Sequence, residues 1–280
     1  MTLANASVLR SLLILALAAS MWGAMPIQAS AESLNARAER LAEHFEVRRP
    51  EGAGPFPVVI MLHGCGGPRP FIEGMADVAV ESGAAVVVVD SFAHRRISRV
   101  AAFATVCTGA RLQGRERAGD LYAAMSWARG QSWADQDRFI AMGWSHGGWT
   151  IMDALALRSG AEMARATGLD DLPEEPLQGL AAAMVVYPYA SVGSYAGRRA
   201  WRLAPRTIAI IAGRDFIVGV PRGPLERQRA RGAPIELHMF ENATHAFEDR
   251  FAEDPRVRYD PDATAREHLL LRELIADVAE

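Results

Sequence analysis

Short apolar runs recur along the sequence and predict strands buried on both faces, because a strand covered on both sides need not alternate polar with apolar residues. The run 84–89 is the most strand-like of them, and 137–142 ends directly before a glycine-rich turn. The predicted buried strands are residues 57–62, 84–89, 137–142, 180–187, 207–212 and 235–240. Residues 43–49 are predicted to form a short strand at the sheet edge.

Helical patterns separate these runs. Residues 71–82 have apolar side chains at helical spacing and are followed by Gly83, a good helix terminator. The predicted helices are residues 71–82, 115–129, 149–157, 224–231 and 263–279. Residues 91–113 are predicted to be irregular, and 160–178 to be a surface excursion that is a candidate lid.

Strands that alternate with helices predict an α/β fold, with a mainly parallel central sheet and helices on both faces. The sequence has no internal repeat, low-complexity tract or linker, so we expect one domain over residues 32–280. Active sites in such sheets lie at the carboxyl ends of the strands. The loops that follow the strands are therefore where catalytic residues are expected.

The first 31 residues have the pattern of a signal peptide. Arg10 precedes a continuous apolar run, 12–19, and Ala29-Ser30-Ala31 offers small residues at the spacing that signal peptidase accepts. The apolar run falls well short of the roughly 20 residues that a membrane-spanning helix needs. We therefore expect cleavage after Ala31, export to the periplasm or the medium, and no membrane association after the signal is removed.

Composition and charge exclude a nucleic-acid partner. Half of the 280 residues are hydrophobic and 22% are charged, as in ordinary globular proteins. The formal net charge is -3, and it becomes -4 when the signal leaves with Arg10. Nucleic-acid binding needs a clustered basic face, which the dispersed arginines do not supply.

The sequence Gly143-Trp144-Ser145-His146-Gly147 lies between a predicted strand and a predicted helix. A serine at such a tight turn is pushed out of the strand, and glycines two residues to either side let strand and helix pack closely beneath it. A glycine-rich turn that merely contains a serine is the alternative. The flanking strand and helix favour Ser145 as a nucleophile.

A serine nucleophile needs an imidazole to take its proton. His245 lies in the loop that follows the last predicted strand, where a base is expected. His146 adjoins Ser145, but its side chain starts the helix and points elsewhere. The remaining histidines precede the core, open a loop, or lie in an arginine-rich segment, a strand or the last helix: His44, His63, His94, His238 and His268.

The imidazole in turn needs a carboxylate to orient it. Asp215 follows the predicted strand 207–212 directly, and so lies at a strand end between Ser145 and His245 in the chain. Asp153, Asp170 and Asp171 lie on a helix or in the excursion instead. We therefore predict a Ser145, Asp215, His245 triad, with an Asx turn as the alternative role of Asp215.

Two backbone N–H groups are required for the oxyanion that forms when serine attacks a carbonyl. One is the N–H of His146, the residue after the nucleophile, and the other is predicted to be that of Cys65 in the loop His63-Gly64-Cys65-Gly66-Gly67. This loop lacks the G-x-G-x-x-G pattern of dinucleotide sites, and Pro68 has no N–H to offer a phosphate.

With these residues in order, the chain from Val58 onward resembles the α/β-hydrolase superfamily and, within it, the dienelactone hydrolase family. The shared motifs are the 63–67 loop, Asp90-Ser91-Phe92, Gly143 to Gly148, Gly213-Arg214-Asp215 and Thr244 to Phe247. The resemblance implies hydrolysis of a small-molecule ester or lactone through an acyl-enzyme, with no metal or organic cofactor. The namesake enzymes carry cysteine as nucleophile where this chain has Ser145, so the resemblance does not fix the substrate.

The resemblance also implies arginines that bind a substrate carboxylate. Arg95 follows the Asp90-Ser91-Phe92 strand end and is the candidate; the alternative is that Arg95, Arg96 and Arg99 form a solvated basic face.

Cys65 and Cys107 are the two cysteines of the chain, and both lie in loops predicted at the same edge of the sheet. Because export allows disulfides, we expect these two thiols to be bridged, with two buried free thiols as the alternative.

Three functions remain from the sequence. The first is an exported serine hydrolase of a small ester or lactone. The second keeps the triad but cuts peptides or polymer-linked esters, and the third is a non-catalytic binding protein on the same fold.

Overall fold

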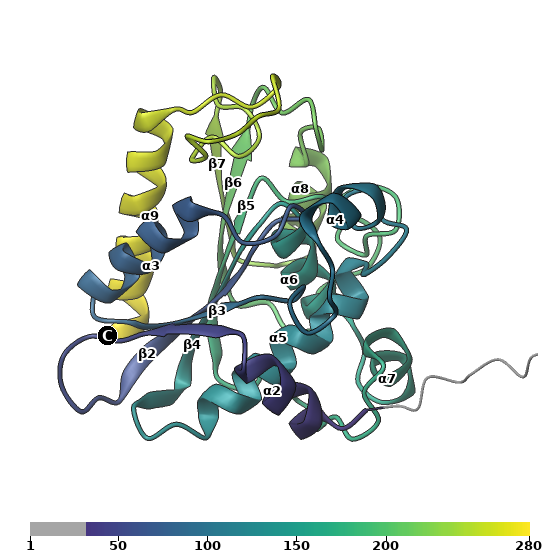
Figure 1. Ribbon diagram of the computed structural model, residues 1–280, viewed down its shortest axis with the longest axis vertical. Coiled ribbons are helices and arrows are strands. Elements are labelled where there is room, and N and C mark those ends of the chain that lie inside the picture. The colour runs from purple at the N-terminus through teal and green to yellow at the C-terminus, as the bar shows by residue number, and fades with distance from the viewer. Residues whose placement is uncertain (1–31) are drawn as a thin grey trace, which may run out of the picture. The chain divides into compact units, whose positions relative to one another are not determined.

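The computed structural model describes residues 32–280, so the predicted signal peptide, residues 1–31, lies outside the described residues. A seven-stranded sheet runs through the described part in the order β1-β3-β2-β4-β5-β6-β7 (Figure 1). Its strands are β1 (Phe45–Arg48), β2 (Phe56–Leu62), β3 (Ala85–Val89), β4 (Ala134–Trp144), β5 (Leu180–Val186), β6 (Arg206–Ala212) and β7 (Ile235–Phe240). The edge strand β1 pairs antiparallel with β3 and the other pairings are parallel, which confirms the predicted α/β class.

Helices cover both faces of the sheet. On one face lie α3 (Pro70–Glu81) and α9 (Pro261–Ala279), which Figure 1 shows side by side at the left. The other face is covered by α2 (Leu34–Ala42), α5 (Gly114–Arg129), α6 (His146–Ala156) and α8 (Arg222–Ala230). Within residues 32–280, no helix is long and apolar enough to cross a membrane.

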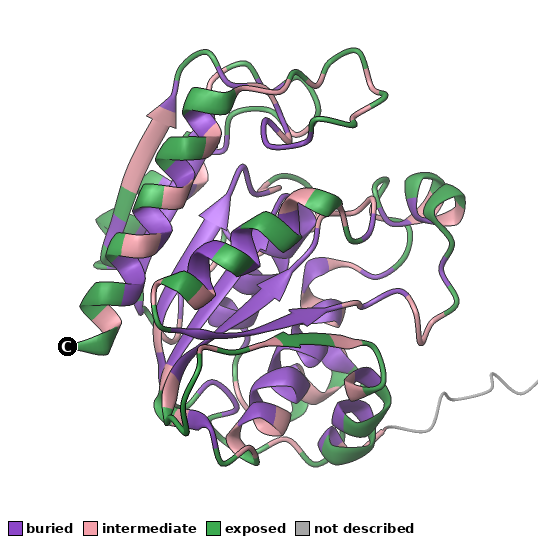
Figure 2. Ribbon diagram, turned by 60° about the vertical axis from the view of Figure 1, so that its left-hand side comes forward, coloured by how far each residue is buried: buried purple, intermediate pink, exposed green. Residues whose placement is uncertain are grey.

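Strand β2 shows why the central strands are apolar throughout. Val58, Ile60 and Leu62 pack toward the α5 and α6 side, whereas Val59 and Met61 pack toward α3 and α9. Figure 2 shows the central strands buried along their length. Each side chain of such a strand leaves water, so the hydrophobic effect favours apolar residues on both faces.

Two short helices lie in segments that the sequence predicted to be irregular. Helix α4 (Arg99–Thr105) lies within 91–113, and α7 (Ala161–Thr167) lies within 160–178. The Ser98 side chain caps α4 by accepting a hydrogen bond from the Ala101 N–H at 3.3 Å. Segment 91–113 also has a small core of its own, made of Phe92, Ile97, Ala102, Val106 and Leu112.

Candidate active site

Ser145 occupies the sharp turn between β4 and α6. Its backbone has φ 51° and ψ -106°, a region that side-chain-bearing residues rarely adopt and that costs about 1–3 kcal/mol. The Ser145 N–H donates to the Val186 carbonyl at 2.9 Å, which anchors the turn to the end of β5. This backbone strain is held by the surrounding sheet and helix, and it lifts the hydroxyl out of the strand.

The flanking glycines are required by close backbone contacts. A Cβ on Gly143 would lie 2.5 Å from the Gly147 carbonyl carbon, and one on Gly147 would overlap the Leu62 carbonyl oxygen. A Cβ on Gly148 would lie 2.8 Å from the Pro188 Cβ. Since only glycine lacks a Cβ, strand β4 and helix α6 approach this closely only with glycine at these positions.

Asp215, His245 and Ser145 form a continuous hydrogen-bonded chain. His245 Nε2 lies 3.0 Å from Ser145 Oγ, and His245 Nδ1 lies 2.7 Å from Asp215 Oδ2. The other Asp215 oxygen accepts the N–H groups of Ile217 and Val218 at 2.9 and 3.0 Å. Asp215 therefore has its carboxylate fixed by the turn after β6, and the loop after β7 carries His245 to it. The structure thus brings together the three side chains that the sequence singled out.

The two backbone donors predicted from the sequence lie beside this chain. Gly64 packs against the nucleophile, since a Cβ built on it would lie 3.6 Å from the Ser145 Cβ. Within residues 32–280, neither the N–H of Cys65 nor that of His146 donates a hydrogen bond to another protein group. Cys65 and His146 both line the cavity at Ser145, so we expect their N–H groups to be available to a ligand oxygen there.

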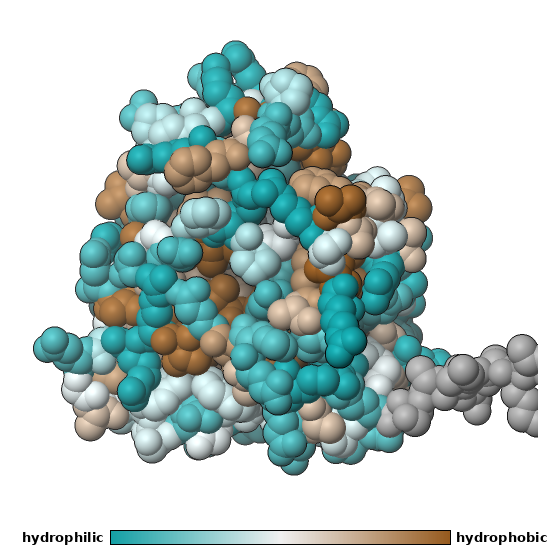
Figure 3. Space-filling view, in the orientation of Figure 1, coloured by the Kyte–Doolittle hydropathy of each residue, from teal (hydrophilic) through white to brown (hydrophobic). Residues whose placement is uncertain are grey.

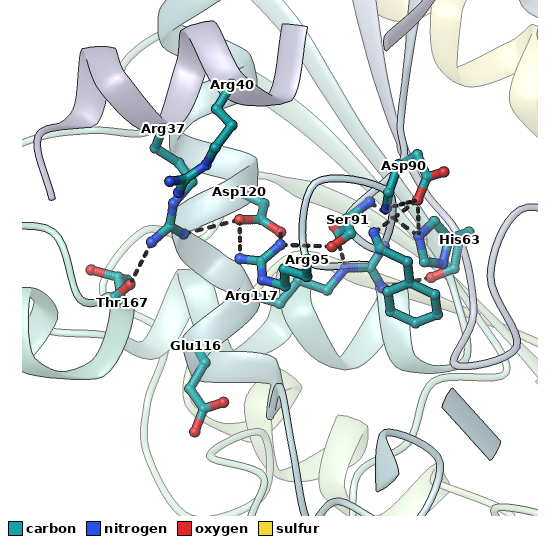
Figure 4. A network of polar contacts seen from close by, with 12 residues as sticks. Arg37, Arg40, His63, Asp90, Ser91, Arg95, Glu116, Arg117, Asp120 and Thr167 are labelled. Atoms are coloured by element: carbon teal, nitrogen blue, oxygen red, sulfur yellow. Dashed lines mark hydrogen bonds and ion pairs between the residues drawn. The ribbon is translucent and has the colours of Figure 1, made fainter. Parts of the chain in front are cut away.

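A buried arginine supports the loop that carries Cys65. Arg117 is fully buried; its Nη1 donates to the His63 carbonyl at 2.7 Å and its Nε to Ser91 Oγ at 2.8 Å (Figure 4). The His63 Nε2 accepts the Ser91 N–H at 3.3 Å, so Nδ1 carries the proton and donates to the Gly64 carbonyl at 2.6 Å. Burial, and then the charge of Arg117, hold the pKa of His63 well below its usual range. The His63 side chain is thus neutral, and its two hydrogen bonds stabilise this loop.

The His146 side chain takes part in the same support. Its Nδ1 lies 3.3 Å from Arg117 Nη1, and its ring packs against Trp149 with centroids 5.0 Å apart. Burial, followed by the charge of Arg117, lowers the pKa of His146 to about 3. Its ring is therefore neutral at working pH.

Arg95 does not have the role that the sequence predicted for it, which was to bind a substrate carboxylate. Its guanidinium is bound to Asp120, with Nη1 to Oδ2 at 2.7 Å and Nη2 to Oδ1 at 2.8 Å, and it does not line the cavity at Ser145. Figure 4 shows Asp120 held between Arg95 and Arg37. Burial alone raises the pKa of Asp120, but the charges of Arg95 and Arg37 outweigh it and hold that pKa below its usual range. Arg95 therefore satisfies a buried carboxylate and is neither a free ligand for substrate nor a solvated charge.

Cys65 and Cys107 are disulfide-bonded in the structure. The bond joins the loop that carries the Cys65 N–H to the chain just beyond α4, 42 residues away in sequence. The disulfide thereby connects α4 to the loop next to Ser145.

A cavity of about 950 Å³ opens above Ser145 and His245. Its walls come from the 64–67 loop, α4 and the turn after it, the ends of β4 and β5, and two later loops around Ile217 and Ala252. No residue of the 160–178 excursion lines it, since α7 packs against α5 on another part of the molecule. The excursion is therefore not a lid over this cavity.

A buried pair of acidic residues, Glu248 and Glu267, lies beneath the site and was not predicted from the sequence. Glu248 and Glu267 are both buried; Tyr187 Oη donates to Glu248 at 2.8 Å and Trp144 Nε1 donates to Glu267 at 2.9 Å. Burial, and then the neighbouring carboxyl, raise the pKa of Glu267 well above its usual range. A raised pKa favours the protonated form of Glu267, whose O–H can donate a hydrogen bond to the neighbouring Glu248. The Tyr187 ring packs on His245 with centroids 4.6 Å apart.

Comparison with known proteins agrees with this architecture. The model of the prolyl oligopeptidase family matches residues 76–161, and no curated protein sequence matches the chain. A protein from Klebsiella pneumoniae subsp. pneumoniae MGH 78578, provisionally assigned as a dienelactone hydrolase, has 18% identity and a TM-score of 0.61, over 84% of this chain and 92% of that one.

Two further solved structures have the same fold. Butyrate-bound esterase 2 of Thermogutta terrifontis has 16% identity and a TM-score of 0.59, over 84% of this chain and 88% of that one. The dienelactone hydrolase-like promiscuous phosphotriesterase P91, from metagenomic libraries, has 20% identity and a TM-score of 0.59, over 84% and 92%. The chain therefore has the α/β-hydrolase fold, in a form similar to that of dienelactone hydrolases and related esterases.

Proposed function

We propose that this protein is an exported serine hydrolase that cleaves carboxylic esters through an acyl-enzyme on Ser145. The observation that carries the proposal is the continuous hydrogen-bonded chain from Asp215 through His245 to Ser145, with Ser145 Oγ facing the cavity. Three residues from separate strand ends meet in the geometry that activates a serine. A folding role alone does not require this arrangement.

In the proposed reaction, Ser145 Oγ attacks the ester carbonyl carbon while its proton moves to His245 Nε2. The carbonyl oxygen becomes an oxyanion that accepts hydrogen bonds from the Cys65 and His146 N–H groups. As the intermediate collapses, the alcohol leaves with the proton from His245, and the acyl group stays on Ser145. Water then attacks the acyl-enzyme, losing a proton to His245, and releases the acid and free Ser145.

The first test is covalent labelling. Esterase 2 of Thermogutta terrifontis is phosphonylated by cyclosarin, and a fluorophosphonate would attach to Ser145 by the same chemistry. We expect one label per chain on Ser145, found by mass spectrometry of peptides, and no label on Ser145→Ala. A wild-type protein that folds but takes no label would instead support a non-catalytic binding protein.

Peptide hydrolysis is the second candidate, favoured by the match of residues 76–161 to the prolyl oligopeptidase family. Esters and amides share the acyl-enzyme, so geometry at Ser145 does not separate them. A panel of aryl esters, polymer-linked esters and proline-containing peptide amides separates them. We expect turnover of the aryl esters to exceed that of the peptides by at least about 100-fold.

A further inference from the structure

Exposed apolar side chains gather around the mouth of the cavity. Large hydrophobic residues scattered singly over a surface are ordinary, but a cluster beside a binding site is informative. Six of the nine exposed large hydrophobic residues described lie on α4 or on the two later loops that line the cavity, namely Val100, Phe103, Phe216, Ile217, Val220 and Phe251. Figure 3 shows hydrophobic side chains at the surface over α4.

The apolar surface continues from this mouth to Ser145. Val100, Phe103 and Ile217 line the cavity while remaining at least a third exposed. The Phe103 ring reaches the loop that carries Cys65, because a Cβ built on Gly66 would lie 3.5 Å from the Phe103 Cζ. An apolar path therefore connects solvent with the reacting serine.

The charges along the cavity balance. Its charged lining residues are three arginines and three acids, namely Arg69, Arg99, Arg256, Asp249, Glu253 and Asp254. Two arginines are ion-paired within the lining, Arg69 with Asp249 at 2.8 Å and Arg256 with Asp254 at 2.6 Å. The two charged lining residues outside these ion pairs are Arg99 and Glu253, and both are exposed. Such a lining does not favour an anionic substrate over a neutral one.

We infer that the substrate of Ser145 is a neutral ester whose large apolar group lies along Phe103 and Ile217 toward the mouth. The inference rests on the proposed function and narrows its substrate class. A cavity of about 950 Å³ lies at the upper end of the roughly 300–1,000 Å³ usual for ligand sites, so a small ester or lactone fills only part of it. Each methylene fully buried there strengthens binding by at most about fourfold.

The test compares p-nitrophenyl acetate, p-nitrophenyl octanoate and the mono-p-nitrophenyl ester of octanedioic acid, which adds a carboxylate to the end of the eight-carbon chain. We expect kcat/KM for the octanoate ester to be at least tenfold higher than kcat/KM for the acetate ester. It should also be at least tenfold higher than kcat/KM for the acid-bearing ester. Phe103→Ala and Ile217→Ala should each lower the octanoate-to-acetate ratio at least threefold. Leu269→Ala, which removes an exposed side chain on α9, is the matched control and should leave the ratio unchanged.

The outcomes separate this inference from the proposed function. A protein that takes the fluorophosphonate label but cleaves acetate or the acid-bearing ester as fast as octanoate overturns the substrate class and leaves the serine hydrolase standing. A protein that takes no label overturns both. Equal changes of the ratio in Leu269→Ala and Phe103→Ala would also overturn the role of Phe103.

A second inference comes from the Glu248 and Glu267 pair. The pair joins three segments that hold the site: Trp144 precedes Ser145 at the end of β4, Tyr187 follows β5 and packs on His245, and Glu248 lies three residues after His245. All four side chains are almost completely buried. The Trp144–Glu267 and Tyr187–Glu248 hydrogen bonds are both buried, and buried hydrogen bonds hold the segments that they join at a fixed spacing.

We propose that Glu248 and Glu267 are positioning residues that set the distance between Ser145 and His245. Trp144 and Glu267 hold the serine side of the link, and Tyr187 and Glu248 hold the histidine side. Because proton transfer depends on this distance, loosening the link slows the chemical step more than it weakens substrate binding.

The test measures kcat and KM per active site, with active sites counted by fluorophosphonate titration so that unfolded protein does not contribute. Glu267→Gln keeps an acceptor for Trp144 and a donor for Glu248, and we expect its kcat within about threefold of the wild-type value. We expect Glu267→Ala to lower kcat at least tenfold, and Tyr187→Phe, which removes one hydroxyl, at least threefold, both with KM within twofold.

Unchanged kcat per titrated site in Glu267→Ala and Tyr187→Phe would show that the pair serves only stability. If Glu267→Ala fails to fold, Tyr187→Phe alone decides. A loss in Glu267→Gln as large as that in Glu267→Ala would also overturn the proposal, because the hydrogen bonds are then not what matters.

Discussion

At the Ser145 turn, one added Cβ atom would prevent β4 and α6 from packing closely together. Gly147→Ala would drive a Cβ into the Leu62 carbonyl oxygen, which is backbone of the central strand β2 and cannot move aside cheaply. We expect a loss of roughly 3 kcal/mol in the free energy of unfolding, measured by urea denaturation.

The matched control is Gly74→Ala on α3. A Cβ there meets no atom within 4 Å and the backbone is helical, so this change should stabilise by about 0.5–1 kcal/mol. Similar stability changes in the two variants would contradict the steric account.

The proposed triad makes a prediction about non-additivity. Ser145→Ala and His245→Ala should each lower kcat by about 10⁴-fold or more, and the double variant should lose little beyond either single one, because the two side chains act as a unit. Asp215→Asn should also be severe, since the amide does not hold the same imidazole tautomer. If the fold losses in kcat of the two single variants multiply in the double variant, the two residues act independently.

The residues of the site differ in how far sequence could predict them. Ser145, Asp215 and His245 each follow a strand, and the rule that parallel strands end at one edge brings such residues together. Arg95 also follows a strand, but its partner Asp120 lies 25 residues further along on α5, and no local pattern reveals that pairing. Glu267 has the spacing of an ordinary helical acid, and only the packing of α9 against the sheet buries it.

At the scale of elements, length limited what could be predicted. The strands and helices α3, α5, α6, α8 and α9 were predicted within a few residues of their ends, whereas the nine-residue helix α2 was not predicted. Helices α4 and α7 have seven residues each, about two turns, and neither presents a repeating apolar face. Tertiary contacts hold both: α4 rests on the small core of segment 91–113, and α7 packs on α5.

The acidic pair joining α9 to the β7 loop should make stability depend on pH. The pKa of Glu267 in the folded protein is raised above its ordinary value of 4.5, so between these two values the folded protein holds more protons than the unfolded one. Wild-type stability therefore falls as pH rises through that window. Glu267→Gln removes this titration, so its stability relative to wild type should increase from pH 5 to pH 8 in urea denaturation. A constant difference over that range would show that folding does not raise the pKa of Glu267.

The disulfide between the 64–67 loop and the end of α4 should contribute to stability. Closing a loop of 42 residues stabilises by about 4 kcal/mol in the chain-entropy description. We expect Cys107→Ser to lower the free energy of unfolding by up to that amount, and reduction of the wild-type protein to do the same. Reductant should leave the stability of Cys107→Ser unchanged, which is the control. A wild-type protein equally stable with and without reductant would contradict the prediction.

At the scale of the whole molecule, the proposed export and the disulfide are consistent with each other. Disulfides persist in oxidising compartments and are rare in a reducing cytosol. Within residues 32–280, Glu32 is anchored: its N–H donates to the Gly168 carbonyl at 3.1 Å, and its carboxylate pairs with Arg37 at 2.7 Å and with Arg40 at 2.5 Å. An amino group created at Glu32 by cleavage still has hydrogens to donate to that carbonyl.

We therefore expect the exported protein to begin at Glu32 and to contain no free thiol. N-terminal sequencing and mass spectrometry of non-reduced peptides from the exported fraction measure both properties. The control is the chain expressed without residues 1–31, which should stay in the cytosol with Cys65 and Cys107 reduced and form the bond on exposure to oxidant. An exported form that retains Met1 would contradict cleavage after Ala31, and one in which both cysteines react with an alkylating reagent would contradict the coupling between export and the bond.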